Sequence, residues 1–212
     1  MRIQRLRGAV LPLLLAVAFA VPAAAQQSDP DAAPAAAPAR KPAVRPKPAA
    51  TAAVRPATPP MMGGSKPTLL GQYGDWGAYT ASPGGKKVCF AIAKPASSAT
   101  VPPNRPRNPI FMFISTRPAD KVSNEVSIII GYPFKPGSDS SLEIGSTAYA
   151  LYTQQDGAWI KNAAEEGQAV DAMRGGQSAL VKGTSSKGTQ STDTYSLKGL
   201  SQALDRVAQD CK

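Results

Sequence analysis

The sequence predicts a mainly β domain over residues 67–212: an antiparallel β-sandwich with one short internal helix and a C-terminal helix. From Thr68 onward, short runs rich in β-branched and aromatic residues alternate with turns built from Gly, Pro, Asn and Asp. Several short strands at this spacing are typical of antiparallel sandwiches and barrels. Two segments show helical signals instead, one within the β-rich pattern and one at its end.

The β-rich runs predict eight strands. The first two are separated by Gly74-Asp75, and the last two flank a Ser-Ser-Lys-Gly turn at residues 185–188, which indicates a hairpin. A Pro-rich loop at residues 95–109 precedes the fourth strand. The expected strands span residues 69–73, 76–80, 87–93, 110–116, 124–132, 146–153, 178–184 and 192–197.

Two helices are expected. Asn162 followed by Glu165 resembles a capping box, and Gly175-Gly176 is a stop signal, so the internal helix is placed at residues 163–174. The C-terminal helix can be capped by Ser201. Its apolar residues recur at the spacing of one helical face, namely Leu200, Ala203, Leu204, Val207, Ala208 and Cys211.

The two cysteines of the chain predict a disulfide between Cys89 and Cys211. Cys211 lies on the apolar face of the last helix, where an inward-facing strand residue such as Cys89 can meet it. In an oxidising compartment, a pair of cysteines favours a disulfide over a thiol nucleophile. Two unpaired buried thiols are the alternative.

The N-terminal part predicts export. Arg2, Arg5 and Arg7 precede an apolar run, and Ala23 and Ala25 fit the small-x-small cleavage pattern, so residues 1–25 are interpreted as a signal peptide. An uncleaved anchor is the alternative, but the run is broken by Pro12 and is shorter than the roughly 20 apolar residues of a spanning helix. The predicted destination is the periplasm, the outer surface or the medium.

Residues 26–66 form a predicted disordered tether rich in Pro, Ala, Lys and Arg, because this composition offers no core. The tether is interpreted as an extended spacer. Electrostatic contact with an anionic cell wall or membrane is the second interpretation, and salt-sensitive attachment would distinguish the two.

The charge distribution argues against nucleic acid as a partner. Residues 1–66 contain nine Lys/Arg and two Asp/Glu, whereas residues 67–212 contain fifteen Lys/Arg and twelve Asp/Glu. The excess positive charge therefore belongs to the leader and tether rather than to a folded face. The absence of His excludes Ser-His-Asp and Cys-His sites, His-ligated zinc and His general-base catalysis. We expect no cofactor and no metal.

Several landmarks together resemble the invasion-associated locus B family over about residues 68–212. They are the Gly74-Asp75-Trp76 start, Cys89, and the closing Ser-Leu-Lys-Gly-Leu-Ser-Gln-Ala-Leu segment at residues 196–204, which leads to Cys211. The order of the internal helix, a Gly and a hairpin is similar to that family too. The resemblance implies an exported β-sandwich protein of alphaproteobacterial type. The family is named for a role in the entry of host red cells, and its many members in free-living bacteria imply a general envelope task.

Few residues are candidates for a site, and no catalytic residue is predicted. Gly74, Asp75 and Trp76 are interpreted as structural, with Asp75 in a turn and Trp76 in the core, although an aromatic residue beside a carboxylate can also bind sugars. Trp159 receives the same two interpretations. Because loops on rigid β scaffolds often bind partners, the loop that carries Arg105 and Arg107 is the candidate binding loop.

The sequence is compatible with three functions. The first is a non-enzymatic envelope protein that binds an unknown envelope or cell-surface protein. The second is a surface-exposed or released factor that contributes to host-cell attachment or invasion. The third is a cell-wall glycosidase, which needs two carboxylates that converge in a cleft roughly 5–9.5 Å apart.

Overall fold

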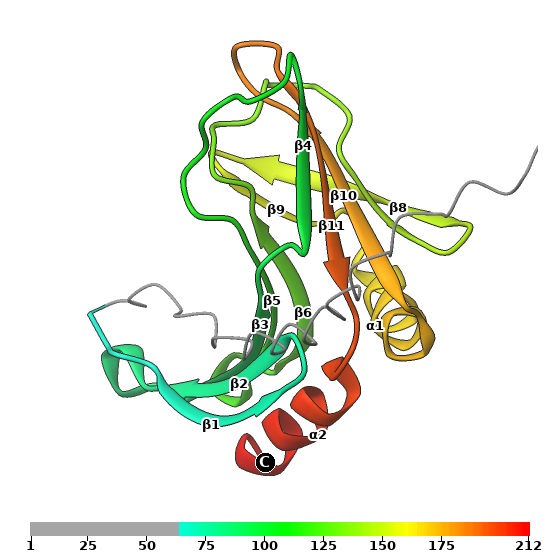
Figure 1. Cartoon of the computed structure of the whole chain (residues 1–212). Helices are drawn as coiled ribbons and strands as arrows, with labels where there is room; N and C mark the ends of the chain where they lie inside the picture. Colours follow the sequence, from blue (N-terminus) through cyan, green and yellow to red (C-terminus); the bar gives the residue numbers. More distant parts are fainter. Residues whose placement is uncertain (1–63) are drawn as a thin grey trace, which may run out of the picture. The chain divides into compact units, whose positions relative to one another are not determined.

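The β-rich pattern folds into one open sheet of eleven antiparallel strands with two helices, in a computed structural model that describes residues 64–212 (Figure 1). The predicted signal peptide and nearly all of the predicted tether lie outside these residues. The strands are β1 (Thr68–Tyr73), β2 (Trp76–Ala81), β3 (Val88–Ala93), β4 (Ser97–Val101), β5 (Phe111–Arg117), β6 (Val122–Ile129), β7 (Ser141–Ile144), β8 (Thr147–Gln154), β9 (Gly157–Ile160), β10 (Ser178–Thr184) and β11 (Gln190–Ser196).

The sheet is continuous because β8 takes part in both of its halves. The first half of β8 pairs with β7, from Thr147 to Ala150, and the second half pairs with β9, from Leu151 to Gln154. The strand order is β1-β2-β3-β5-β6-β9-β8-β7-β10-β11-β4. The predicted mainly β, antiparallel class is therefore confirmed. A sandwich of two separate sheets is not shown, because β8 pairs with β7 and with β9 and so joins all the strands into one sheet.

β4 reveals how strongly this sheet curves. In the chain it lies between β3 and β5, which pair with each other, yet β4 itself pairs with β11 at the far edge of the sheet. Only residues 94–96 connect β3 to β4, a link that spans at most about 14 Å. The far edge must therefore lie near the end of β3, as the drawing shows (Figure 1).

The helices lie where the sequence predicts them, with small shifts at their starts. A 3-10 turn, η3 (Ala163–Glu165), leads into α1 (Glu166–Gly175), and Asn162 accepts a hydrogen bond from the Ala164 N–H at 3.2 Å. α2 (Leu200–Asp210) begins after Gly199 rather than Ser201. Two further 3-10 turns are η1 (Pro83–Gly85) and η2 (Pro118–Asp120).

One hydrophobic cluster joins both halves of the sheet to both helices. α2 contributes Leu200, Ala203, Leu204 and Val207 to it, so four positions of the predicted stripe are buried there, whereas Ala208 is exposed. α1 adds Ala169, Val170 and Met173. No helix among residues 64–212 is long and apolar enough to cross a membrane.

Candidate functional site

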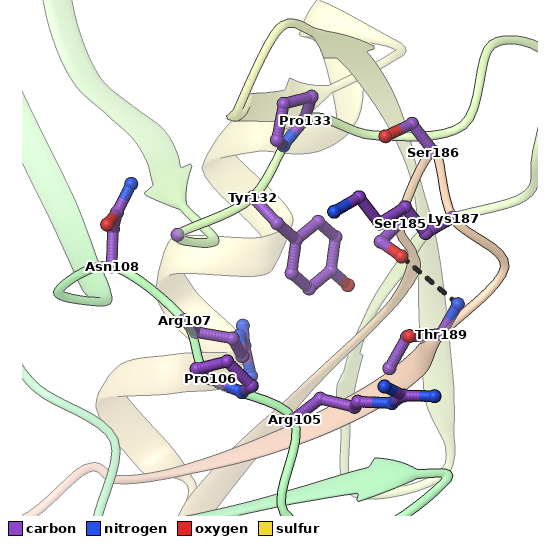
Figure 2. Close-up of a pocket in the computed structure, with 11 residues that line it drawn as sticks. Arg105, Pro106, Arg107, Asn108, Tyr132, Pro133, Ser185, Ser186, Lys187 and Thr189 are labelled. Carbon is purple, nitrogen blue, oxygen red and sulfur yellow. Dashed lines mark hydrogen bonds between the residues drawn. The ribbon is translucent and has the colours of Figure 1, made fainter.

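Three loops from distant parts of the chain meet at one end of the sheet and enclose a cavity of about 480 Å³ (Figure 2). The first follows β4, the second follows β6, and the third is the hairpin turn between β10 and β11. The first and third loops meet there because β4 pairs with β11, and the pairing of Val101 with Gln190 brings the start of the loop that follows β4 beside the hairpin. The lining residues are Arg105, Pro106, Arg107, Asn108, Gly131, Tyr132, Pro133, Ser185, Ser186, Lys187 and Thr189.

Arg107 forms the floor of this loop pocket. Its guanidinium donates two hydrogen bonds to the carboxylate of Asp193 on β11, both at 2.7 Å, and its Nε donates to the Ile130 carbonyl at 3.0 Å. The Arg107 side chain is 6% exposed and that of Asp193 is 0% exposed. This geometry satisfies the buried charges of both residues and fixes the loop on the sheet.

Tyr132 completes the floor, and the fully buried Tyr195 lies outside the pocket lining. The ring of Tyr132 lies 4.9 Å from the Arg107 guanidinium carbon, and its hydroxyl shares a 2.6 Å hydrogen bond with Ser191. Burial raises the pKa of Tyr132, and it raises that of the fully buried Tyr195 much further. Tyr132 is therefore neutral at physiological pH, so it offers the pocket a hydroxyl group rather than charge.

The rim of the pocket carries the charge that a ligand can reach. Arg105 and Lys187 are exposed, and neither lies in an ion pair within residues 64–212. Figure 2 shows Pro106, Arg107 and Asn108 on one side of the pocket and the Ser185–Thr189 turn on the other, with the Arg105 side chain extending toward the turn. Within the turn, the Thr189 N–H donates to the Ser185 hydroxyl at 3.0 Å. Hydroxyl groups and two cations thus surround the opening of the pocket, whereas the charge of Arg107 below them is balanced by Asp193.

A second hollow of about 450 Å³ adjoins the first across the loop that follows β4. Arg105 and Arg107 line both hollows. The other residues around the second hollow are Ser98, Ala99, Thr100, Pro103, Asn104 and Ile110. Arg105 is therefore accessible from two sides of the loop.

The pair of arginines predicted from sequence is thus divided between two roles. Arg105 is an exposed rim residue, whereas Arg107 is a buried anchor. Sequence reasoning missed Tyr132, placed inside a predicted strand, and Lys187, placed in a hairpin turn. The one sequence signal for Lys187 is its position in a predicted turn. Nothing in the local sequence indicates that this turn faces the loop some 80 residues earlier.

The chemistry that this pocket can perform is recognition of an anion. Guanidinium and ammonium groups with nearby hydroxyls suit a carboxylate or a phosphate. No Asp or Glu is among the residues that line either hollow. Within the described part of the chain, no three His, Cys, Asp or Glu side chains form a group that could hold a metal ion.

Gly74, Asp75 and Trp76 lie away from the loop pocket, against the segment that precedes α2. The Asp75 N–H donates to the Lys198 carbonyl at 3.1 Å, and the Trp76 indole N–H donates to the Ser196 carbonyl at 2.9 Å. Gly74 has a φ of 55°, and a Cβ there would lie 2.6 Å from the Lys198 oxygen. Trp76 is fully buried in the main core.

Trp159 differs from Trp76. It is half-buried on the opposite face of the sheet, where its ring centroid lies 6.3 Å from that of the exposed Tyr152. Of the two tryptophans interpreted as core residues, only Trp76 therefore belongs to the main core.

The disulfide between Cys89 and Cys211 is confirmed, with a Cα–Cα distance of 5.9 Å. It joins β3 to the residue that follows α2, and it links positions 122 residues apart. A structural disulfide indicates an oxidising, extracytoplasmic location.

Comparison with known proteins identifies the family. The family model described as "Invasion associated locus B (IalB) protein" matches residues 76–208, a span that begins at Trp76 and ends within α2. No curated protein and no solved structure matches the chain. The matched span covers more than half of the chain and includes every strand from β2 to β11. The chain therefore belongs to the invasion associated locus B family.

Proposed function

We propose that this protein is a non-enzymatic binding protein of the bacterial envelope, which acts in the periplasm by holding an anionic group of a partner protein or surface in the loop pocket. The observation that carries the proposal is that two exposed cations, Arg105 and Lys187, line one pocket whose lining has no carboxylate. A partner's carboxylate or phosphate would give these cations the counter-charge that the described residues do not supply.

The buried floor supports this proposal because it makes the pocket rigid. Arg107 is held to β11 through Asp193 and to Ile130, the residue after β6, through the Ile130 carbonyl. A loop held in this way loses little conformational entropy when a ligand binds. The lining also supports binding rather than hydrolysis, since it has no pair of carboxylates for acid and base catalysis.

Crosslinking in intact cells tests the proposal. A photoreactive amino acid at Ser186, which is exposed on the pocket rim, should give a specific adduct with an envelope component. The same group at Asp171, which is exposed on α1, should not give this adduct. An identical adduct from both positions would contradict the proposal.

Charge variants make the crosslinking test specific to the pocket. Arg105→Gln/Lys187→Gln should weaken the Ser186 adduct at least severalfold, since it removes both rim cations. Lys161→Gln/Lys198→Gln removes the same charge from exposed positions outside the pocket and should leave the adduct unchanged. Equal loss in the two double variants would mean that net charge, not the pocket, governs binding.

A second candidate function is contact with host cells by a surface-exposed or released protein, which the family's description favours. Protease accessibility of a C-terminal tag separates the two candidates. Cleavage only after the outer membrane is permeabilised would support the periplasmic function. Cleavage in intact cells would support surface exposure.

A further inference from the structure

β4 forms one edge of the sheet and is open to solvent. Within residues 64–212 it pairs with β11 along Ser97–Val101, and no strand lies on its other side. Four of its five residues are exposed, and Val101 is 66% exposed. The unpaired side of an edge strand presents backbone N–H and C=O groups, so β4 offers a further strand a row of hydrogen-bonding groups.

The two edges of the sheet differ in how they prevent pairing with another chain. At the opposite edge, the register of β1 is irregular between Leu69 and Gly71, which interrupts the row of groups that another strand needs. β4 keeps a regular register over its whole length. Its sequence, Ser-Ser-Ala-Thr-Val, has neither a charged residue nor a proline. β4 therefore lacks the bulge, charge and proline that block pairing at many edges.

The second hollow, of about 450 Å³, runs along β4. Three consecutive residues of this strand line it: Ser98, Ala99 and Thr100. Because successive side chains of a strand point to opposite faces of the sheet, a hollow that contacts three residues in a row lies beside the strand rather than over one face. β11 occupies the paired side, so the hollow lies on the unpaired side. The loop that follows β4 supplies most of the remaining lining, and Figure 1 draws it on the side of β4 away from β11.

Two cations lie at one end of this strand. The Arg105 N–H donates to the Thr100 hydroxyl at 3.2 Å, so the loop folds back beside the end of β4. Val101 pairs with Gln190, which brings the turn that carries Lys187 to the same end. Arg105 lines both hollows, and neither lining contains Asp or Glu. The hollow beside β4 and the loop pocket therefore share a cationic end.

We propose that β4 is the docking strand for an extended acidic segment of a partner protein. The segment pairs with the unpaired side of β4 and places a carboxylate at Arg105 and Lys187. This inference rests on the proposed function, because it assigns the anion of the loop pocket to a peptide.

The arrangement favours a peptide over other anions. A phosphate-bearing lipid or glycan can meet the two cations, but it has no regular row of donors and acceptors to match β4. A peptide satisfies both features, because its main chain pairs with the edge while its carboxylate binds the cations. The small side chains of Ser98 and Ala99 also let another backbone approach closely.

Calorimetric titration of the chain without its predicted leader tests the proposal. The probe is the peptide Asp-Thr-Val-Thr-Val-Thr-Asp, which carries a carboxylate at either end and so suits both strand directions. Its matched control is the same peptide with N-methyl groups on the three central residues. The control keeps every charge but loses main-chain donors on both of its edges, so it should bind about tenfold more weakly, or worse.

The outcomes separate this inference from the proposed function. Equal binding of the two peptides, lost for both in Arg105→Gln/Lys187→Gln, would overturn the docking strand and leave anion binding in place. Binding of both peptides that this double variant does not weaken would contradict the proposed function as well. Failure of the unmethylated peptide to bind at millimolar concentration would overturn the docking strand.

Hydrogen exchange followed by NMR locates the bound peptide. Amides of Ser97–Val101 that point away from β11 should exchange about tenfold more slowly, or slower still, in the saturated complex, because each gains a hydrogen-bond acceptor. Amides of β1, the opposite edge, are the internal control and should not change. Protection at β1, or unchanged exchange throughout β4, would overturn the proposal.

The same measurements identify other occupants. Protection of β4 that rises with protein concentration in the absence of peptide, together with a dimer in sedimentation, would assign this edge to a second copy of the chain. Anionic lipid vesicles that bind more tightly than the peptide, without protecting β4, would assign the two cations to a membrane surface. Either result would overturn the docking strand.

Discussion

Arg105 and Arg107 lie two residues apart in one loop, yet their environments are opposite. Arg107 is buried because its charge meets Asp193, a partner 86 residues away, whereas Arg105 extends to the rim. The sequence predicted a basic loop but could not divide these roles, since burial depends on a partner that only the pairing of β4 with β11 brings close. Trp159 was misjudged for a related reason: its face of the sheet is set by its pairing with Ser127.

At this scale we predict that Arg107→Ala lowers the free energy of unfolding by about 3–5 kcal/mol, because it leaves the buried Asp193 carboxylate without a counter-charge. Arg105→Ala should change it by less than about 0.5 kcal/mol, as is usual at exposed positions. Urea unfolding of both variants measures the difference. Equal effects of the two substitutions would contradict the assignment of Arg107 as anchor.

The double variant Arg107→Met/Asp193→Leu checks the reason for this loss. Because an apolar pair of similar volume needs no counter-charge, it should recover much of the stability lost in Arg107→Ala. If it were as unstable as the single variant, loss of packing rather than an unpaired charge would be the cause.

At the scale of elements, the predicted strands and both helices correspond to parts of the structure, and the strands that were missed share clear causes. β4 has the sequence Ser-Ser-Ala-Thr-Val, is almost wholly exposed at an edge, and lies next to a Pro-rich stretch, so it has no buried face to produce alternation. β7 and β9 are only four residues long. Their pairing with longer strands, rather than their own pattern, makes them strands.

The element that closes the domain is the disulfide between β3 and the end of α2. Removing it as Cys89→Ala/Cys211→Ala should lower the free energy of unfolding by up to about 4–5 kcal/mol, since it frees a loop of more than 100 residues in the unfolded chain. Denaturant unfolding of the oxidised parent and the double variant measures this loss. A loss below about 1 kcal/mol would mean that the contacts of α2 alone hold the closure.

At the scale of the whole molecule, the sequence predicted the class, the disulfide and the family, because these depend on local patterns and on landmarks in order. The landmarks also meet in space: the Gly74-Asp75-Trp76 start contacts the backbone of residues 196–198, just before α2. The continuity of the sheet through β8 and the convergence of three loops could not be predicted. Both follow from long-range pairing, which leaves no periodic signal in the sequence.

The loop pocket is the feature on which the proposed function depends, so its binding of anions is the most direct test. The measurement is a heteronuclear NMR titration of the chain without its predicted leader, using inorganic phosphate and a short acidic peptide as probes. We predict shift changes confined to residues 105–108, 131–133 and 185–189, reduced by salt and lost in Arg105→Gln/Lys187→Gln. Three results would contradict the account: no shift changes, shift changes scattered over the whole surface, or shift changes that persist in that double variant.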